Sequence, residues 1–113
     1  MLGFSSYSRC IEVIASGDGA ISTIMAVQSL VCTIIDQFGS DEQKIKFLTP
    51  LLSGDTIGAF MLTEPEVGSD ASKITVQATQ YGNHYKLSGT KQFVTSGANA
   101  NVAIVFAVTP HHR

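Results

Sequence analysis

Charged side chains are scarce in this sequence. They make up 14% of the 113 residues, and seven Lys and Arg stand against nine Asp and Glu, which gives a formal net charge of −2. The basic residues do not cluster, so no segment offers the basic patch that binds nucleic acid. A hydrophobic fraction of 44% and a mean hydropathy of +0.22 instead suit a chain that packs within a larger body.

Cysteines and long apolar runs are also few. Cys10 and Cys32 lack CxxC spacing, and in a reducing compartment we expect both to be buried free thiols. The longest apolar stretch, 20–35, contains Ser and Thr and has only about 16 residues, which is short for a membrane span. Residues 1–7 have neither the basic nor the apolar region of a secretory signal. We therefore expect an intracellular chain with no membrane and no nucleic-acid partner.

The first half of the chain has helical periodicity. Apolar residues at helical intervals predict a helix over 6–16, and Gly17-Asp18-Gly19 supplies a stop. Residues 20–38 are apolar nearly all round, which predicts a helix buried within a bundle.

A third helix is predicted from its start signal. Ser40 and Gln43 have the spacing of a capping box, in which each side chain satisfies an amide of the first turn. Pro50 and Ser53-Gly54 mark the end region of this helix.

After Asp55 the spacing of the apolar residues changes from that of a helix to the shorter period of a strand. Strands are predicted where β-branched and aromatic residues concentrate, with Gly and Asn at the turns, and residues 81–84 predict a hairpin connection. The predicted strands are 56–62, 74–79, 85–87, 92–95 and 102–108.

Helices followed by strands, without βαβ alternation, predict an α+β fold. We expect a bundle-type helical segment in 1–54 and an antiparallel β-domain, a partial barrel, in 55–113. The two parts could also be adjoining fragments of separate domains. The last strand is apolar on both faces and has no evident cover, so we expect further sequence downstream.

Polar and conformationally special residues concentrate in LTEPEVGSD at 62–70. This segment follows an apolar strand, and ligand-binding loops are common at such places. Pro65 fixes a turn, Gly68 lets a backbone approach a ligand closely, and Thr63 and Ser69 offer hydroxyls. These groups suit a flavin ring or a phosphate, although the same composition also fits an ordinary acidic turn.

A second cluster is KQFVTSG at 91–97. As a strand it would place Phe93 and Thr95 on one face, where a ring and a hydroxyl can stack on and hydrogen-bond to a planar heterocycle. A core Phe beside a surface Thr is the alternative interpretation of these two residues.

Together, LTEPEVGSD and KQFVTSG, separated by a YKLSG hairpin, resemble the paired flavin-binding signatures of FAD-dependent acyl-CoA dehydrogenases. The resemblance continues through GDGAISTIMAVQSL, FGSDEQKIKFLTPLLSGDTIGAF and IVFAVT, and so covers the chain from Tyr7 to Thr109. It implies the end of an N-terminal helical domain in 1–54 and the start of a middle β-barrel domain in 55–113. The C-terminal four-helix bundle of the family is absent from the sequence.

The resemblance also implies which residues bind the cofactor FAD. They are Phe60, Leu62, Thr63, Gly68, Ser69, Phe93, Val94 and Thr95. The Thr63 hydroxyl would bond the pyrimidine edge of the flavin, and Thr95 would lie near its N5 atom. Gly68 and Ser69 would reach the phosphates, and Ser69 would also bind the acyl-CoA substrate. Weaker candidates for the wall of the acyl pocket, with core packing as the alternative, are Met25, Ala26 and Ser29.

By resemblance the chain is part of an oxidoreductase acting on CH-CH donors. The implied reaction removes the α-proton of an acyl-CoA thioester and passes the β-hydrogen as hydride to FAD, which gives trans-2-enoyl-CoA in fatty-acid or branched-chain acyl-CoA catabolism. The catalytic base of the family is a Glu of the C-terminal domain, so no residue here is assigned as catalytic. Glu64, Glu66 and Asp70 are expected to serve loop structure.

Electron-transfer flavoprotein is the implied electron acceptor, and full-length members of the family are homo-oligomers. The implied compartment is the bacterial cytoplasm or, in a eukaryote, the mitochondrial matrix. No metal site is assigned, because His84, His111 and His112 lack the spacing of a ligand set.

Two alternatives to an acyl-CoA dehydrogenase fragment stay open. The first is a truncated, non-catalytic scaffold that binds no flavin. The second is a related acyl-CoA oxidase, which differs in how well the reduced flavin is shielded from oxygen.

Overall fold

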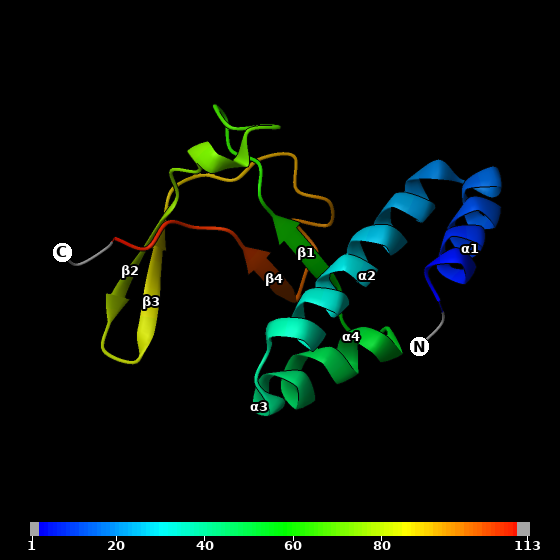
Figure 1. Cartoon of the computed structure of the whole chain (residues 1–113), viewed down its shortest axis with the longest axis horizontal. Helices are drawn as coiled ribbons and strands as arrows, with labels where there is room; N and C mark the ends of the chain where they lie inside the picture. The colour runs from blue at the N-terminus through cyan, green and yellow to red at the C-terminus, as the bar shows by residue number, and fades with distance from the viewer. Residues whose placement is uncertain (1–2, 111–113) are drawn as a thin grey trace.

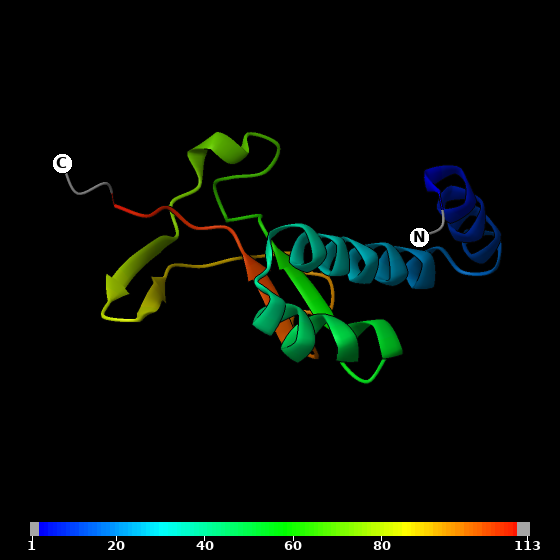
Figure 2. The same ribbon diagram turned by 60° about the horizontal axis from the view of Figure 1, so that its bottom comes forward.

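The computed structural model describes residues 3–110, so the expectation for His111 and His112 lies outside the described residues. The molecule is elongated, with principal extents of 49 × 34 × 25 Å. Two helices lie at one end and a β-hairpin at the other, with a second pair of strands between them in both views (Figures 1 and 2).

A helical hairpin begins the fold. The predicted first two helices are confirmed as α1, Phe4–Gly17, and α2, Gly19–Phe38. The residue between them, Asp18, is extended, and its carboxylate accepts hydrogen bonds from the amides of Ala20 at 2.7 Å and Ile21 at 3.0 Å. The predicted stop therefore also contains the N-cap of α2, which satisfies amides that the helix itself leaves unpaired.

Helix α2 buries one face only. The core cluster consists of Val31, Cys32, Ile35 and Leu51. The other side of α2 leaves Ile24, Leu30 and Phe38 exposed, so the prediction of a helix buried all round is wrong for the described residues. By length and hydropathy alone α2 also resembles a membrane span, as apolar core helices of soluble proteins do. The sequence pattern could not separate these cases, because it records polarity and not contact.

The two cysteines differ in burial. Both are free thiols, as expected, but only Cys32 is buried, while Cys10 is exposed on α1. Burial of Cys10 was therefore a wrong prediction, because α1 contributes no residue to the core.

The third helical segment is irregular. Its capping box is confirmed: Ser40 Oγ accepts from the Gln43 amide at 3.2 Å, and Gln43 Oε1 accepts from the Ser40 amide at 2.9 Å. Helix α3, Asp41–Gln43, continues into the π-helical turn η1, Lys44–Leu48, and into α4, Thr49–Ser53. Pro50 lies in the first turn of α4, where its missing N–H is tolerated, and the left-handed Gly54 ends the helix.

The β-part consists of two separate pairs of strands. Strands β1, Gly58–Met61, and β4, Val102–Val105, are parallel; β1 packs against α2, and Val102 and Ile104 of β4 pack against the core cluster. Strands β2, Gln77–Tyr81, and β3, His84–Ser88, form an antiparallel hairpin whose turn falls at the predicted residues 81–84. A short 3₁₀ helix, η2, spans Ala71–Lys73.

The α+β class is confirmed, with helices first and strands afterwards. The observed strands differ in detail from the expected antiparallel partial barrel. Within residues 3–110 the β1–β4 pair is parallel, and the two pairs are not joined into one sheet. The long connection between β1 and β4 removes the geometric need for an antiparallel return, which applies to strands joined by a tight turn.

Candidate functional site

The LTEPEVGSD loop closes on itself directly after β1. The amide of Glu64 donates to the Val67 carbonyl at 3.0 Å, and the amide of Val67 donates back to the Glu64 carbonyl at 3.1 Å. Pro65 and Glu66 lie at the exposed tip of this small bridge. The tip is thus a defined turn, and the loop leaves it in a fixed direction towards Gly68.

Gly68 and Ser69 form the open side of the loop. Both are exposed, and a Cβ built on Gly68 would meet no atom within 4 Å. Within residues 3–110 the hydroxyl of Ser69 donates no hydrogen bond, unlike that of Ser72, which donates to Asp70 at 2.5 Å. This side of the loop therefore leaves room for a ligand at close range.

The KQFVTSG segment is a turn and not the predicted strand. Phe93 and Ser96 have left-handed backbones with φ values of 54° and 60°, and the Gly97 amide donates to the Val94 carbonyl at 3.0 Å. Left-handed residues interrupt the extended backbone of a strand. The expectation that Phe93 and Thr95 share one strand face is therefore wrong, although the residues still lie close together in the turn.

Phe93 presents its ring to solvent. It is 88% exposed, whereas Thr95 and Val94 are half-buried. The alternative of a core Phe beside a surface Thr does not hold for this segment. A bulky residue with positive φ is unusual and is found where the surrounding structure forces it.

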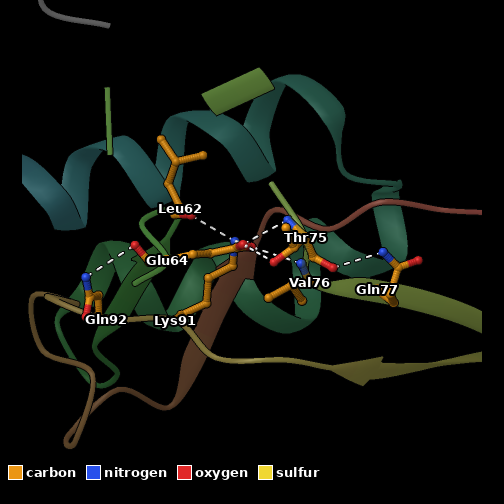
Figure 3. A network of polar contacts seen from close by, with 7 residues as sticks. All are labelled: Leu62, Glu64, Thr75, Val76, Gln77, Lys91 and Gln92. Atoms are coloured by element: carbon orange, nitrogen blue, oxygen red, sulfur yellow. Dashed lines mark hydrogen bonds and ion pairs between the residues drawn. The ribbon is translucent and has the colours of Figure 1, made fainter. Parts of the chain in front are cut away.

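Three hydrogen bonds to main-chain carbonyls join the two motifs. The Lys91 ammonium donates to the Leu62 carbonyl at 2.8 Å, the Gln92 amide donates to the Thr63 carbonyl at 3.0 Å, and Gln92 Nε2 donates to the Glu64 carbonyl at 3.2 Å. Figure 3 shows Lys91 and Gln92 reaching across to the loop from their own segment. The motifs are far apart in sequence but form one surface.

A buried ion pair lies beneath this surface. The carboxylate of Glu64 is 2.8 Å from the Lys91 ammonium, and their side chains are 2% and 8% exposed. Glu64 also accepts from the amide and hydroxyl of Thr75, at 2.8 and 2.6 Å, and from the Val76 amide at 3.0 Å (Figure 3). Each of the two carboxylate oxygens thus accepts two hydrogen bonds from protein donors.

The contacts determine the charge state of Glu64. Burial by itself would raise the pKa of the Glu64 carboxyl, but the Lys91 ammonium, the Thr75 hydroxyl and the two amides stabilise the anion more strongly. Together they lower the pKa from 4.5 to about 2. Glu64 is therefore a structural anion at neutral pH.

The predicted site residues fall into two groups. Leu62 and Thr63 are held beside the turn that carries Phe93, Val94 and Thr95. Phe93 and Val94 also line a hollow of about 460 Å³ between this turn, β3 and β1.

The other predicted residues lie apart from that hollow. Gly68 and Ser69 lie on the outer part of the loop, beyond the Glu64–Val67 bridge. Phe60 lies on β1, packs against the core cluster and meets the Phe106 ring edge-on at a centroid distance of 5.1 Å. The three weaker candidates separate as well: Ala26 and Ser29 line a groove between α1 and α2, while Met25 lines a hollow beside α4.

Sequence reasoning missed Lys91 and Gln92. Both lie in the recognised KQFVTSG motif, and the buried partner of Lys91, Glu64, lies in the other one. One acidic and one basic residue in two motifs that were expected to bind the same ligand were the available signal. Nothing local in the sequence shows that the two side chains meet.

Comparison with known proteins assigns both halves of the chain to one family. The family model described as "Acyl-CoA dehydrogenase, N-terminal domain" matches residues 1–55, and "Acyl-CoA dehydrogenase, middle domain" matches residues 59–113. The chain belongs to the acyl-CoA dehydrogenase family.

Relatives and solved structures agree with this assignment. A short-chain specific acyl-CoA dehydrogenase of Megasphaera elsdenii is 43% identical over 92% of this chain and 28% of its own length. A mitochondrial isobutyryl-CoA dehydrogenase of Dictyostelium discoideum is 37% identical over 90% of this chain and 24% of its own. The crystal structure of a glutaryl-CoA dehydrogenase of Mycobacterium smegmatis in complex with FADH2 has a TM-score of 0.82 and 42% identity, over 88% of this chain and 26% of that one.

This acyl-CoA dehydrogenase family chain spans about a quarter of the length of the curated relatives it matches.

The remaining carboxylates of the LTEPEVGSD loop are either hydrogen-bonded or exposed to solvent. The Ser72 hydroxyl and then the Lys73 ammonium, at 3.0 Å, lower the pKa of Asp70, and Glu66 is exposed at the tip of the turn. Asp70 is thus held by side chains close to it in the sequence, and Glu66 is solvated.

Proposed function

We propose that this chain forms one wall of the flavin and substrate site of a FAD-dependent acyl-CoA dehydrogenase. The enzyme would convert an acyl-CoA thioester to trans-2-enoyl-CoA and pass its electrons to electron-transfer flavoprotein. The observation that carries the proposal is the set of contacts from Lys91 and Gln92 to the Leu62–Glu64 segment, which joins both motifs beside an exposed aromatic ring.

The residues present fit the shape and chemistry of FAD. Phe93 offers an open ring face on which a planar isoalloxazine can stack, and Gly68 offers backbone that a diphosphate can approach. Within residues 3–110 the hydroxyls of Thr63 and Ser69 donate to no protein acceptor, so both are available to a ligand. A flavin wall needs these three kinds of group.

Each proposed binding residue has a distinct task. We assign the pyrimidine edge of the flavin to Thr63, its N5 region to Thr95, and the phosphates to Gly68 and Ser69. Ser69 also binds the acyl-CoA. The residues proposed to line the ring by apolar contact are Phe60, Leu62, Phe93 and Val94.

Bound flavin supplies the hydride acceptor for the β-hydrogen of the substrate. This chain binds and orients the cofactor and shields part of it from water. Proton removal from the α-carbon needs a carboxylate whose pKa lies near the working pH. With a pKa of about 2 and four protein donors, Glu64 is a poor base, and we assign the catalytic base to none of the described residues.

The wider setting of the chain is also proposed. The division into a helical part, 1–54, and a β-part, 55–113, agrees with the limits of the two family matches. The bacterial cytoplasm or the mitochondrial matrix, and a homo-oligomeric whole enzyme, stay predictions. The named relatives act on short-chain and isobutyryl-CoA substrates, and we propose an acyl-CoA without specifying its chain.

Flavin retention tests the proposal. The purified chain is incubated with FAD and desalted, and its visible absorbance is measured, followed by a fluorescence titration of FAD. We expect retained flavin, and we expect Phe93→Ala to weaken binding about tenfold by removing one stacking contact. Tyr85→Ala is the matched control, since this exposed aromatic lies on the β2–β3 hairpin away from both motifs.

Loss of all flavin from the wild-type chain would contradict the proposal and favour the non-catalytic scaffold. If flavin is retained, photoreduction followed by exposure to air separates a dehydrogenase from an oxidase. Slow reoxidation of the reduced flavin supports the dehydrogenase. Fast reoxidation would favour the related acyl-CoA oxidase.

A further inference from the structure

The Glu64–Lys91 ion pair connects three segments that are separate in the sequence. Lys91 contacts the end of β1 through the Leu62 carbonyl, and Glu64 contacts the approach to β2 through Thr75 and Val76. The pair therefore reaches the first motif, the second motif and the segment that precedes β2 (Figure 3).

The burial of this pair is not explained by stability alone. Removing two charges from water is costly, and a buried ion pair often contributes no more stability than a well-packed apolar pair would. What the charged pair adds is direction, since carboxylate and ammonium accept and donate along defined axes. Such pairs can be retained because they select one arrangement of the chain.

The arrangement selected here is that of the Phe93 turn against the loop. Gln92 follows Lys91 directly, and its two hydrogen bonds to the Thr63 and Glu64 carbonyls depend on where Lys91 is held. Phe93 comes next, with the left-handed φ of 54° that a free chain would avoid. The ring is thus presented by a backbone that the preceding two residues hold in place.

Neither charged group is free to bond a ligand, although Lys91 is among the residues that line the hollow beside Phe93 and Val94. The Glu64 side chain is 2% exposed, and its carboxylate accepts from four protein donors. The Lys91 side chain is 8% exposed, and its ammonium lies between two protein oxygens. We therefore expect the two charges to act on a cofactor through the positions of Thr63 and Phe93.

We propose that Glu64 and Lys91 are positioning residues for the flavin site: they hold the Thr63 loop and the Phe93 turn at the separation that binds the isoalloxazine, without touching it. This inference rests on the proposed function. It identifies residues whose charge matters to the cofactor although no part of that charge faces it.

The test compares variants that lose the contacts between the two loops with variants that lose or change side chains elsewhere. Lys91→Met and Glu64→Gln break the pair. Gln28→Leu is the destabilised control, because it removes hydrogen bonds to the Leu51 and Thr56 carbonyls and from the Gly58 amide, while none of the hydrogen bonds between the two motifs involves Gln28. Lys86→Met makes the same substitution at an exposed lysine of β3, outside both motifs.

The first readout is FAD affinity at a temperature where every variant is folded. We expect Lys91→Met and Glu64→Gln to raise the FAD Kd about tenfold or more and to broaden the visible flavin bands, since small misplacements of binding groups are costly. Gln28→Leu and Lys86→Met should stay within about twofold of wild type. Lys91→Arg, which retains the charge, should recover part of the affinity.

The second readout needs no cofactor. In the apo chain, amide hydrogen exchange at Gln92 should become about tenfold faster or more in Lys91→Met. Exchange at Ala78, whose amide donates to Val108 at 2.8 Å, should be unchanged and shows that the variant is folded. If Lys91→Met fails to fold, Glu64→Gln, which retains the shape of the side chain, replaces it.

The outcomes separate the two proposals. Wild-type chain that binds FAD, together with unchanged affinity in both pair-breaking variants, overturns the positioning role and leaves the proposed function standing. Wild-type chain that binds no FAD overturns the proposed function, and the exchange of Gln92 then still decides whether the pair holds the two loops together. Unchanged amide exchange at Gln92 in Lys91→Met would show that the ion pair does not hold the two loops together.

Discussion

The side-chain oxygen of Gln28 accepts a hydrogen bond from the Gly58 amide at 2.8 Å, and this contact joins the middle of α2 to the first residue of β1. The same side chain donates to the carbonyls of Leu51 and Thr56, each at 3.0 Å. One half-buried amide thus connects α2, α4 and the start of the β-part, at the junction of the regions matched by the two family models. All of its partners are backbone groups, so these hydrogen bonds depend on Gln28 and not on the identity of the partner residues.

Gln28→Leu should lower the free energy of unfolding by about 2 kcal/mol, because it leaves backbone groups without partners in a partly buried place. Urea unfolding followed by far-ultraviolet circular dichroism measures the change. Gln37→Leu, an exposed position on the same helix, should change it by less than about 0.5 kcal/mol. Equal effects at the two positions would show that Gln28 does not hold the junction.

Gly58→Ala should destabilise the chain by about 1 to 3 kcal/mol through overpacking. A Cβ at this position would lie 2.8 Å from Cγ1 and 3.0 Å from Cβ of Val31, which is fully buried on α2. Combining the change with Val31→Ala should recover part of the loss in a double-mutant cycle. Gly17→Ala meets no atom within 4 Å and should be neutral or mildly stabilising, by up to about 1 kcal/mol.

Stability should fall in acid because of Glu64. Its folded-state pKa of about 2 is below the ordinary 4.5, so its contribution is fully present above about pH 4.5 and is lost as the pH falls towards 2. The charged group that contacts Glu64 within residues 3–110 is Lys91. Urea midpoints measured across this window should fall less steeply in Glu64→Gln than in wild type.

Asp70→Asn is the control for this pH dependence. The pKa of Asp70 is also lowered, by Ser72 and then Lys73, but its side chain is more than half exposed and solvent screens the pair. The slope of stability with pH should therefore change little in Asp70→Asn. A larger change in Asp70→Asn than in Glu64→Gln would show that Asp70, and not Glu64, causes the loss of stability in acid.

Phe93→Gly should separate stability from binding. Glycine tolerates the φ of 54° without strain, and the ring it removes is 88% exposed, so unfolding free energy should stay within about 1 kcal/mol of wild type. FAD affinity should fall as in Phe93→Ala. By contrast, Phe47→Gly removes a ring packed on the core and should cost about 3 kcal/mol or more. Both quantities come from urea unfolding and fluorescence titration of the same samples.

Much of the fold was predictable because its signals are local. The capping box of Ser40 and Gln43 and the hairpin turn at residues 81–84 depend on hydrogen bonds between residues a few positions apart. The buried positions Val76 and Ala78 follow from strict alternation before and within β2. In each case the sequence supplies both partners within one short window.

The wrong predictions concern features that depend on contacts between segments far apart in the sequence. Residues 92–95 have the composition of a strand, yet long-range hydrogen bonds from Lys91 and Gln92 place Phe93 in a left-handed turn. The parallel direction of β4 on β1 depends on pairing between segments far apart in the sequence, which no local pattern records.

The sequence by itself determined the family, the order of helices before strands, the helix caps, the hairpin and the two motifs proposed to bind flavin. Tertiary structure alone decided that Glu64 and Lys91 meet, that Phe93 faces outward and that α2 buries a single face. The physical reason is range: caps and turns are hydrogen-bonded between neighbours, whereas an ion pair across 27 residues exists only after distant segments have packed together.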